Sequence, residues 1–211
     1  MKKNIVVLSF AIILILILAA FTFLPKEPFS AAGVLPIGSD LPKADIKMKD
    51  IGDEDISMMD AKRKNGLLVM FSCNTCPYVI KNQERTKAIC KYALQNNIGV
   101  ILLNPNEGQR TDDDSFEAMQ LYAKDQNYEW YYVVDKNHEI ADAFGANRTP
   151  ENFLFDKNLK LVYHGAIDDN PGDDSNVKHE HLKNAMNSLL SGKELAVKET
   201  RSVGCSIKRR R

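Results

Sequence analysis

Two cysteines separated by two residues, Cys73 and Cys76, have the spacing that thiol–disulfide chemistry requires. The apolar run 66–71 before them predicts a strand buried on both faces, and the stretch 73–97 predicts a long helix. A thiol at the first turn of a helix lies at the positive end of the helix dipole, which favours its thiolate. We therefore expect Cys73 to be the acidic, attacking thiol. Cys76, one turn deeper, would resolve the mixed disulfide that forms on Cys73.

Composition and charge exclude several classes of protein. Lys and Arg together number 28, as do Asp and Glu, so no net positive charge would attract nucleic acid. The four cysteines are too few for a disulfide-stapled miniature scaffold. Neither a second Cys-x-x-Cys nor a His-x₃-His spacing is present to complete a zinc site. We expect no cofactor, which leaves redox chemistry or a structural disulfide for the cysteine pair.

The elements that position the cysteines alternate between strand and helix patterns. Their order, β-α-β-α-β-α-β-β-α, predicts a mixed central sheet with helices on both faces. This is the α/β thioredoxin fold, with an extra helix and strand inserted midway. The predicted strands are a hairpin of 44–49 and 55–59, then 66–71, 100–103 and 130–134, and a second hairpin of 152–155 and 160–164. The predicted helices are 73–97, one beginning after Ser115, a short one from His138 to Gly145, and a last one ending at Gly192.

The N-terminal residues have the pattern of a targeting segment. Lys2 and Lys3 precede an uncharged apolar run, 5–24, that is long enough to span a bilayer. We expect a single-pass membrane anchor whose lysines stay in the cytoplasm, so that the rest of the chain faces outside. The alternative is a cleaved signal and a secreted protein, because residues 30–32 are the small ones that a signal peptidase prefers.

These patterns divide the chain into four parts. The compartment outside the cytoplasm permits disulfides, which favours a redox role for the cysteine pair. The expected parts are a signal or anchor helix at 1–25, a linker at 26–42, the thioredoxin-like domain at 43–192 and a C-terminal tail at 193–211.

The segment 71–79, F-S-C-N-T-C-P-Y-V, resembles the C-N-H-C-P-Y-V stretch of a thioredoxin-like branch of the redoxin group. That group also contains the alkyl hydroperoxide reductases and thiol-specific antioxidants. Further matches, which extend the resemblance over about 38–208, are D-S-F-E-A-M at 114–119, Thr149-Pro150, V-Y-H-G-A-I-D at 162–168 and G-C-S-I-K at 204–208. The chain departs from the pattern at Thr75, where a His is usual, at Arg209, where a Trp is usual, and at Met70, where thioredoxins carry a buried Asp.

The resemblance and the cysteine pair imply a thiol–disulfide oxidoreductase that acts on the disulfides or thiols of proteins or small molecules, and the N-terminal pattern places it outside the cytoplasm. It also implies that Pro150 is a cis-proline packed against the Cys-x-x-Cys loop. A cis peptide there would let Thr149 offer its main chain to an extended substrate. These two residues are therefore the predicted substrate-binding residues.

Two other functions stay open at this point. A peroxiredoxin-like antioxidant would reduce peroxides, but the Pro-x₃-Thr-x₂-Cys motif of peroxiredoxins is absent before either cysteine. A non-enzymatic copper carrier would bind its metal through Cys73, Cys76 and His164. In the copper proteins of this fold the cysteines are spaced one residue further apart, so the spacing favours the redox function.

Cys205 is a third cysteine that could take part in the chemistry. Gly204 and the surrounding basic residues would give it a mobile, positively charged environment that favours a thiolate. The chain from the last helix to Cys205 can extend about 45 Å, which is enough to reach Cys73. We expect some Cys73–Cys205 or intermolecular disulfide in oxidised protein. The alternative is a free thiol on a disordered tail.

Overall fold

A computed structural model describes residues 33–210. The predicted anchor or signal at 5–24 lies outside these residues, and no helix within them combines the length and apolar character needed to cross a membrane. The strands are β1 (Met48–Lys49), β2 (Asp55–Ile56), β3 (Gly66–Phe71), β4 (Ile98–Asn104), β5 (Tyr131–Val134), β6 (Arg148–Thr149), β7 (Glu151–Phe155), β8 (Leu161–Gly165) and β9 (Cys205–Ser206). The helices are α2 (Met58–Ala61), α3 (Pro77–Lys81), α4 (Gln83–Gln95), α5 (Phe116–Asp125), α6 (Glu139–Phe144) and α7 (His181–Ser191), with short 3₁₀ turns at 107–109, 136–138 and 174–176.

The central sheet has five strands in the order β5-β4-β3-β7-β8. β3, β4 and β5 run parallel, whereas β7 and β8 form an antiparallel hairpin. β3 and β4 are buried along their whole length, which explains their continuous apolar sequences. The predicted thioredoxin-like α/β fold with a mixed sheet is confirmed, and the cysteine loop follows its central strand.

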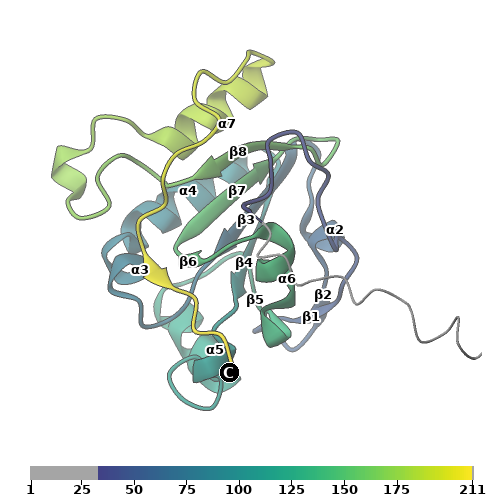
Figure 1. The fold of residues 1–211 in the computed structure, drawn as a ribbon, viewed down its shortest axis with the longest axis vertical. Coiled ribbons are helices and arrows are strands. Elements are labelled where there is room, and N and C mark those ends of the chain that lie inside the picture. The colour runs from purple at the N-terminus through teal and green to yellow at the C-terminus, as the bar shows by residue number, and fades with distance from the viewer. Residues whose placement is uncertain (1–32, 211) are drawn as a thin grey trace, which may run out of the picture. The chain divides into compact units, whose positions relative to one another are not determined.

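Alternate residues of β3 point to opposite faces of the sheet, and each face has its own helices. Leu67, Val69 and Phe71 pack with residues of α2 and α6 in one core. Leu68 and Met70 pack with residues of α4, α5 and α7 in the other. In Figure 1, α6 lies in front of the strands and α4 lies behind them. Because both faces are covered, the end of β3 is held rigidly where the cysteine loop begins.

The helix after the cysteines differs from the predicted span 73–97. It begins only at Pro77, with Cys76 as its N-cap, and it is divided at Asn82 into α3 and α4. Proline favours the first helical position because its missing N–H would have no partner there. The Asn82 side chain donates a hydrogen bond to the Tyr78 carbonyl oxygen at 2.7 Å, next to the division. Cys73 therefore lies in a loop before the helix rather than at its start.

The first hairpin is also shorter than predicted. Only Asp55–Ile56 of the expected strand 55–59 forms β2, and Met58–Ala61 forms α2. The reason is a capping box, in which the Ser57 side chain accepts from the Asp60 backbone N–H and the Asp60 side chain accepts from the Ser57 backbone N–H. This reciprocal capping starts a helix where the apolar pattern alone indicated a strand.

The residues after α7 pack on the domain up to residue 210. Ile207 is buried in the core that contains α6, and Arg209 forms an ion pair with Asp142 at 2.9 Å. In Figure 1 this C-terminal segment, drawn in yellow, runs from α7 past α3 and β6 towards α5. The alternative of a disordered tail carrying Cys205 is therefore wrong.

Close packing of β4 against α2 gives a test of the fold. A Cβ at Gly99 would lie 1.9 Å from the Ala61 carbonyl oxygen, whereas a Cβ at Gly172 would have no neighbour closer than 3.8 Å. We expect Gly99→Ala to lower the free energy of unfolding by about 1–3 kcal/mol, because backbone has to move to make room. Urea unfolding of the reduced protein measures this change, with Gly172→Ala as the matched control. Equal urea midpoints for the two variants would contradict the close approach of β4 and α2.

Candidate active site

The two cysteines of the Cys-x-x-Cys loop are both buried against Thr149. The relative exposure is 1% for Cys73 and 4% for Cys76. The Cys73 Sγ lies 3.3 Å from the Thr149 Oγ1, and the Cys76 thiol donates to the Thr149 carbonyl oxygen at 3.1 Å. The peptide bond between Thr149 and Pro150 is cis, as the resemblance implied. The structure therefore brings together all four residues that the sequence predicted at the centre of the site.

The surroundings of the two cysteines shift the pKa values of their thiols in opposite directions. The hydrogen bond from Cys73 lowers the pKa of Cys76, against the effect of burial. Cys76 is also the N-cap of α3, where first-turn N–H groups favour a thiolate. The same hydrogen bond to Cys76, together with burial, raises the pKa of Cys73. We expected Cys73 to be the acidic thiol because the helix was predicted to begin there. The helix begins at Pro77 instead, so the predicted helix start is wrong, and the argument from the helix dipole applies to Cys76.

Thr149 affects the two protonation states of Cys76 differently. Its carbonyl oxygen can only accept a hydrogen bond, so it stabilises Cys76 as a thiol. Its hydroxyl, 3.3 Å from Cys73, can donate and accept. The site can thus hold a thiolate on Cys76 with a thiol on Cys73, and it can also hold Cys76 as a thiol.

A buried carboxylate that was named above only within the motif at 114–119 supports the cysteine loop. Asp114 is completely buried, and its Oδ1 accepts from the Asn74 backbone N–H at 2.9 Å and from the Asn104 side chain at 2.8 Å. Its Oδ2 accepts from the Asn106 side chain at 2.8 Å. Its negative charge is a further cause of the raised pKa of Cys73. A buried carboxylate is therefore present near the pair although Met70 replaces the buried Asp of thioredoxins.

Cys205 lies at the same site as the pair. β9 pairs antiparallel with β6, so that Cys205 is opposite Thr149. Cys205 packs, partly exposed, against the cluster of Cys73, Cys76 and Val79. The predicted accessory thiol is thus brought next to the predicted redox pair.

His164 does not join this cluster. Its Nε2 lies 2.8 Å from the Glu151 Oε1, and the other oxygen of Glu151 accepts from the backbone N–H groups of Asn147 and Arg148 at 2.9 and 3.2 Å. The His164–Glu151 pair therefore fixes the loop that leads into Thr149. Within residues 33–210 no three His, Cys, Asp or Glu side chains are grouped as metal ligands. The copper-carrier alternative has no ligand geometry to support it.

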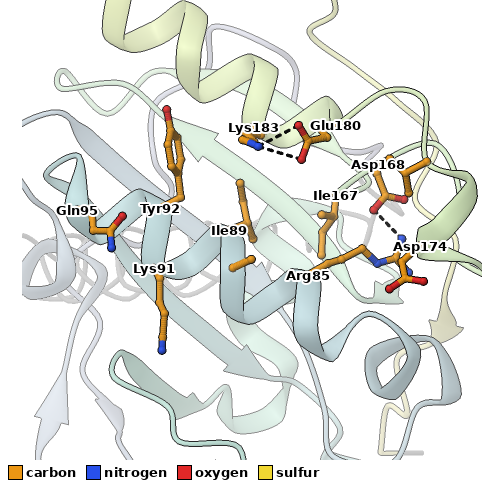
Figure 2. Close-up of a pocket in the computed structure, with 12 residues that line it drawn as sticks. Arg85, Ile89, Lys91, Tyr92, Gln95, Ile167, Asp168, Asp174, Glu180 and Lys183 are labelled. Atoms are coloured by element: carbon orange, nitrogen blue, oxygen red, sulfur yellow. Dashed lines mark hydrogen bonds and ion pairs between the residues drawn. The ribbon is translucent and has the colours of Figure 1, made fainter.

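A hollow of about 460 Å³ lies away from the cysteines, between α4 and the segment that leads into α7. Figure 2 shows it lined by Ile89 and Tyr92, with Arg85 and Asp168 at one end. The Arg85 Nη1 lies 2.6 Å from the Asp168 Oδ2, and this half-buried ion pair connects α4 to the loop after β8.

The unequal acidity of the thiols predicts a thiolate that persists in mild acid. We expect the thiolate absorbance of the reduced protein near 240 nm to remain as pH falls from 8 and to disappear only well below the usual titration range of a cysteine, because Cys73 lowers the pKa of Cys76. Cys73→Ser should raise the pH at which half of the thiolate absorbance is lost, because Cys73 makes the largest contribution to stabilising the Cys76 thiolate. Cys90 is the matched control: burial raises its pKa, so Cys90→Ala should leave the titration unchanged. A thiolate signal that survives in Cys76→Ser but is absent from Cys73→Ser would contradict the assignment.

Comparison with known proteins shows a family to which this sequence is similar. Residues 36–180 match the Redoxin family, and no curated protein matches the chain. An uncharacterized conserved protein from Geobacillus kaustophilus has a TM-score of 0.77 and 29% identity, over 83% of this chain and 93% of its own. A hypothetical protein from Sinorhizobium meliloti 1021 has a TM-score of 0.77 and 30% identity, over 84% of this chain and 97% of its own.

More distant structures share the fold alone. A putative thiol:disulfide interchange protein DsbE from Chlorobium tepidum has a TM-score of 0.56 and 15% identity, over 74% of this chain and 99% of its own. The family match covers more than half of the sequence and contains the Cys-x-x-Cys loop and Thr149-Pro150. The chain therefore belongs to the Redoxin family.

Proposed function

We propose that this protein is a thiol–disulfide oxidoreductase whose redox pair is Cys73 and Cys76. The observation that carries the proposal is the convergence of both thiols on Thr149, with Cys76 at the N-cap of α3. A lowered pKa makes a thiolate available at neutral pH, and a neighbouring thiol can resolve the mixed disulfide that this thiolate forms. Thr149 and Pro150 are the proposed substrate-binding residues.

The pair supports a two-step exchange. In the first step the Cys76 thiolate attacks one sulfur of a substrate disulfide, forming a Cys76–substrate bond and expelling the other sulfur as a thiolate. In the second step the Cys73 sulfur attacks the Cys76 sulfur, and the proton of Cys73 passes to the departing substrate thiolate. The substrate disulfide gains two electrons and Cys73–Cys76 becomes the disulfide. Two external thiols, or one dithiol, reverse the sequence, restore the reduced pair and are themselves oxidised to a disulfide.

The opposite order of attack, with Cys73 first, is the order that the sequence alone favoured. The position of the helix N-terminus and the lowered pKa of Cys76 support the order proposed here.

Peroxide reduction would use the same first thiolate, which a peroxide would oxidise to a sulfenic acid with release of water or an alcohol. Cys73 would then condense with that acid to give the same disulfide and a second water.

We further propose that the domain lies outside the cytoplasm, attached to the membrane by residues 5–24. The two lysines before an uncharged apolar run support this location, and so does an oxidising compartment for a disulfide-forming pair.

Single-cysteine variants test the redox pair and its order. Mixed disulfides are trapped with a disulfide peptide in the absence of an electron donor, and turnover is measured with dithiothreitol as the donor. Cys73→Ser in a Cys205→Ser background should accumulate a mixed disulfide on Cys76, because neither neighbouring thiol is left to resolve it. Cys76→Ser should accumulate none, and both variants should lose turnover, whereas Cys90→Ala should retain it. Mass spectrometry of the trapped species and the peptide reduction rate are the measurements. Trapping on Cys73 alone would reverse the proposed order, and full turnover in either variant would refute the proposed function.

The location has its own test. We expect the full-length protein in the membrane fraction, with its intact mass including residues 5–24. Protease added to spheroplasts should digest the domain, because it would be accessible from outside. A purified chain beginning at about Ala32 or Gly33 would show a cleaved signal instead of an anchor, and protection from protease would contradict the extracytoplasmic location.

A further inference from the structure

The strand β9 occupies the edge of β6 beside the cysteine pair. Thr149 is paired with Cys205 and Arg148 with Ser206 in antiparallel register. Gly204 approaches so closely that a Cβ there would lie 2.3 Å from the Thr149 carbonyl oxygen. An extended peptide that adds a strand to a sheet edge would make the same kind of contact. The C-terminal segment therefore occupies the edge at Thr149 that an extended peptide could use.

Contacts on both sides hold this segment in place. Before β9, the backbone N–H of Thr200 donates to the His164 carbonyl oxygen at 3.0 Å. After β9, the N–H of Ile207 donates to the Asn147 carbonyl oxygen at 3.0 Å, and the N–H of Lys208 donates to the Asn106 side chain at 2.9 Å. Ile207 itself is buried. Because hydrogen bonds hold the chain on both sides of β9, this strand is a fixed part of the site.

The three thiols differ in how far solvent reaches them. Cys73 and Cys76 are buried at 1% and 4% exposure, whereas Cys205 is partly exposed. With β9 in place, a disulfide on another protein has access to Cys205 before it has access to the buried pair. Cys205 packs against the cluster that contains Cys73 and Cys76, and both Cys73 and Cys205 lower the pKa of Cys76.

We propose that Cys205 is a third redox-active thiol, which relays electrons between the buried Cys73–Cys76 pair and a protein dithiol outside. This inference rests on the proposed function and deepens it by naming the group that meets the partner. The earlier expectation joined Cys205 to Cys73, and the contacts in the structure join it to Cys76.

The relay is a disulfide exchange that needs no further oxidant. In the oxidised pair, the Cys205 thiolate attacks the Cys76 sulfur, so that a Cys76–Cys205 bond forms while the Cys73–Cys76 bond breaks. Cys73 leaves as a thiolate and takes up the proton that Cys205 gave up. A thiolate of the partner then attacks Cys205 and releases Cys76, and the partner's second thiol resolves that mixed disulfide. The partner dithiol is oxidised by two electrons, and all three thiols of this protein end reduced.

Disulfide mapping in Cys73→Ser tests the contact directly. After treatment of the full-length protein with oxidised glutathione, we expect a Cys76–Cys205 linked peptide, with Cys90 still alkylatable. Gly204→Val changes no cysteine, but its side-chain atoms would collide with Thr149 and displace β9. The double variant Cys73→Ser, Gly204→Val should therefore lose most of the linked peptide. Glutathione adducts on Cys76 and Cys205 in place of the link, in both backgrounds, would overturn the proposal.

Turnover separates the relay from the proposed function. With a reduced protein dithiol as electron donor, Cys205→Ser should slow oxidation of that donor by about tenfold or more while Cys90→Ala leaves it unchanged. The Cys73–Cys76 disulfide should still form in Cys205→Ser. Unchanged turnover in Cys205→Ser, with faster turnover in Gly204→Val, would show that β9 only covers the site and would overturn the relay alone. Absence of a Cys73–Cys76 disulfide in the unaltered protein would refute the proposed function itself.

Discussion

The site depends on the position of one backbone segment, the strand β6 that ends at Thr149. Thr149 contacts Cys73 through its hydroxyl, accepts from Cys76 through its carbonyl oxygen and pairs with Cys205 through its main chain. Two of these three contacts use main-chain atoms, so they depend on where the backbone lies rather than on the side chain. The Glu151 carboxylate fixes that backbone by accepting from the N–H groups at 147 and 148, and His164 in turn holds Glu151.

A second constraint is the buried polar network around Asp114. A buried carboxylate is costly unless hydrogen bonds replace its hydration, and Asp114 accepts three of them, one from the cysteine loop and two from Asn104 and Asn106 at and just after the end of β4. Losing a partner in such a network costs about 1–3 kcal/mol for each buried group left unsatisfied. Asn106 also accepts from the Lys208 backbone. The network thus connects the cysteine loop, the loop after β4 and the C-terminal segment, which are the surroundings of all three site thiols.

Much of the fold could be predicted from the sequence because its signals are periodic. The apolar run 66–71 predicted β3, the predicted strand 100–103 lies within β4, and the last predicted helix is α7, whose C-cap Gly192 has the left-handed conformation. The start of α3 was missed because its boundary depends on Pro77 at the first helical position and not on apolar spacing.

The parts of the site that were missed depend on contacts between distant segments. Asp114 belongs to an acidic run that reads as solvent-exposed, and only the fold shows that its carboxylate is buried beneath the cysteine loop. The pairing of β9 with β6 has no local signal apart from Gly204, whose role becomes visible once its close approach to Thr149 is known. By contrast, Cys73, Cys76 and Thr149-Pro150 could be identified because their motifs are short and specific.

The central claim is that Cys73 and Cys76 form one reversible redox couple, and a redox titration tests it most directly. The protein would be equilibrated over a series of glutathione potentials, alkylated, and mapped by mass spectrometry. The account predicts that Cys73 and Cys76 become protected together in one two-electron transition, about 30 mV for each tenfold change in the ratio of oxidised to reduced protein, with Cys90 alkylatable throughout. Cys73 and Cys76 that remain alkylatable at every potential, or that become protected in separate transitions, would contradict it.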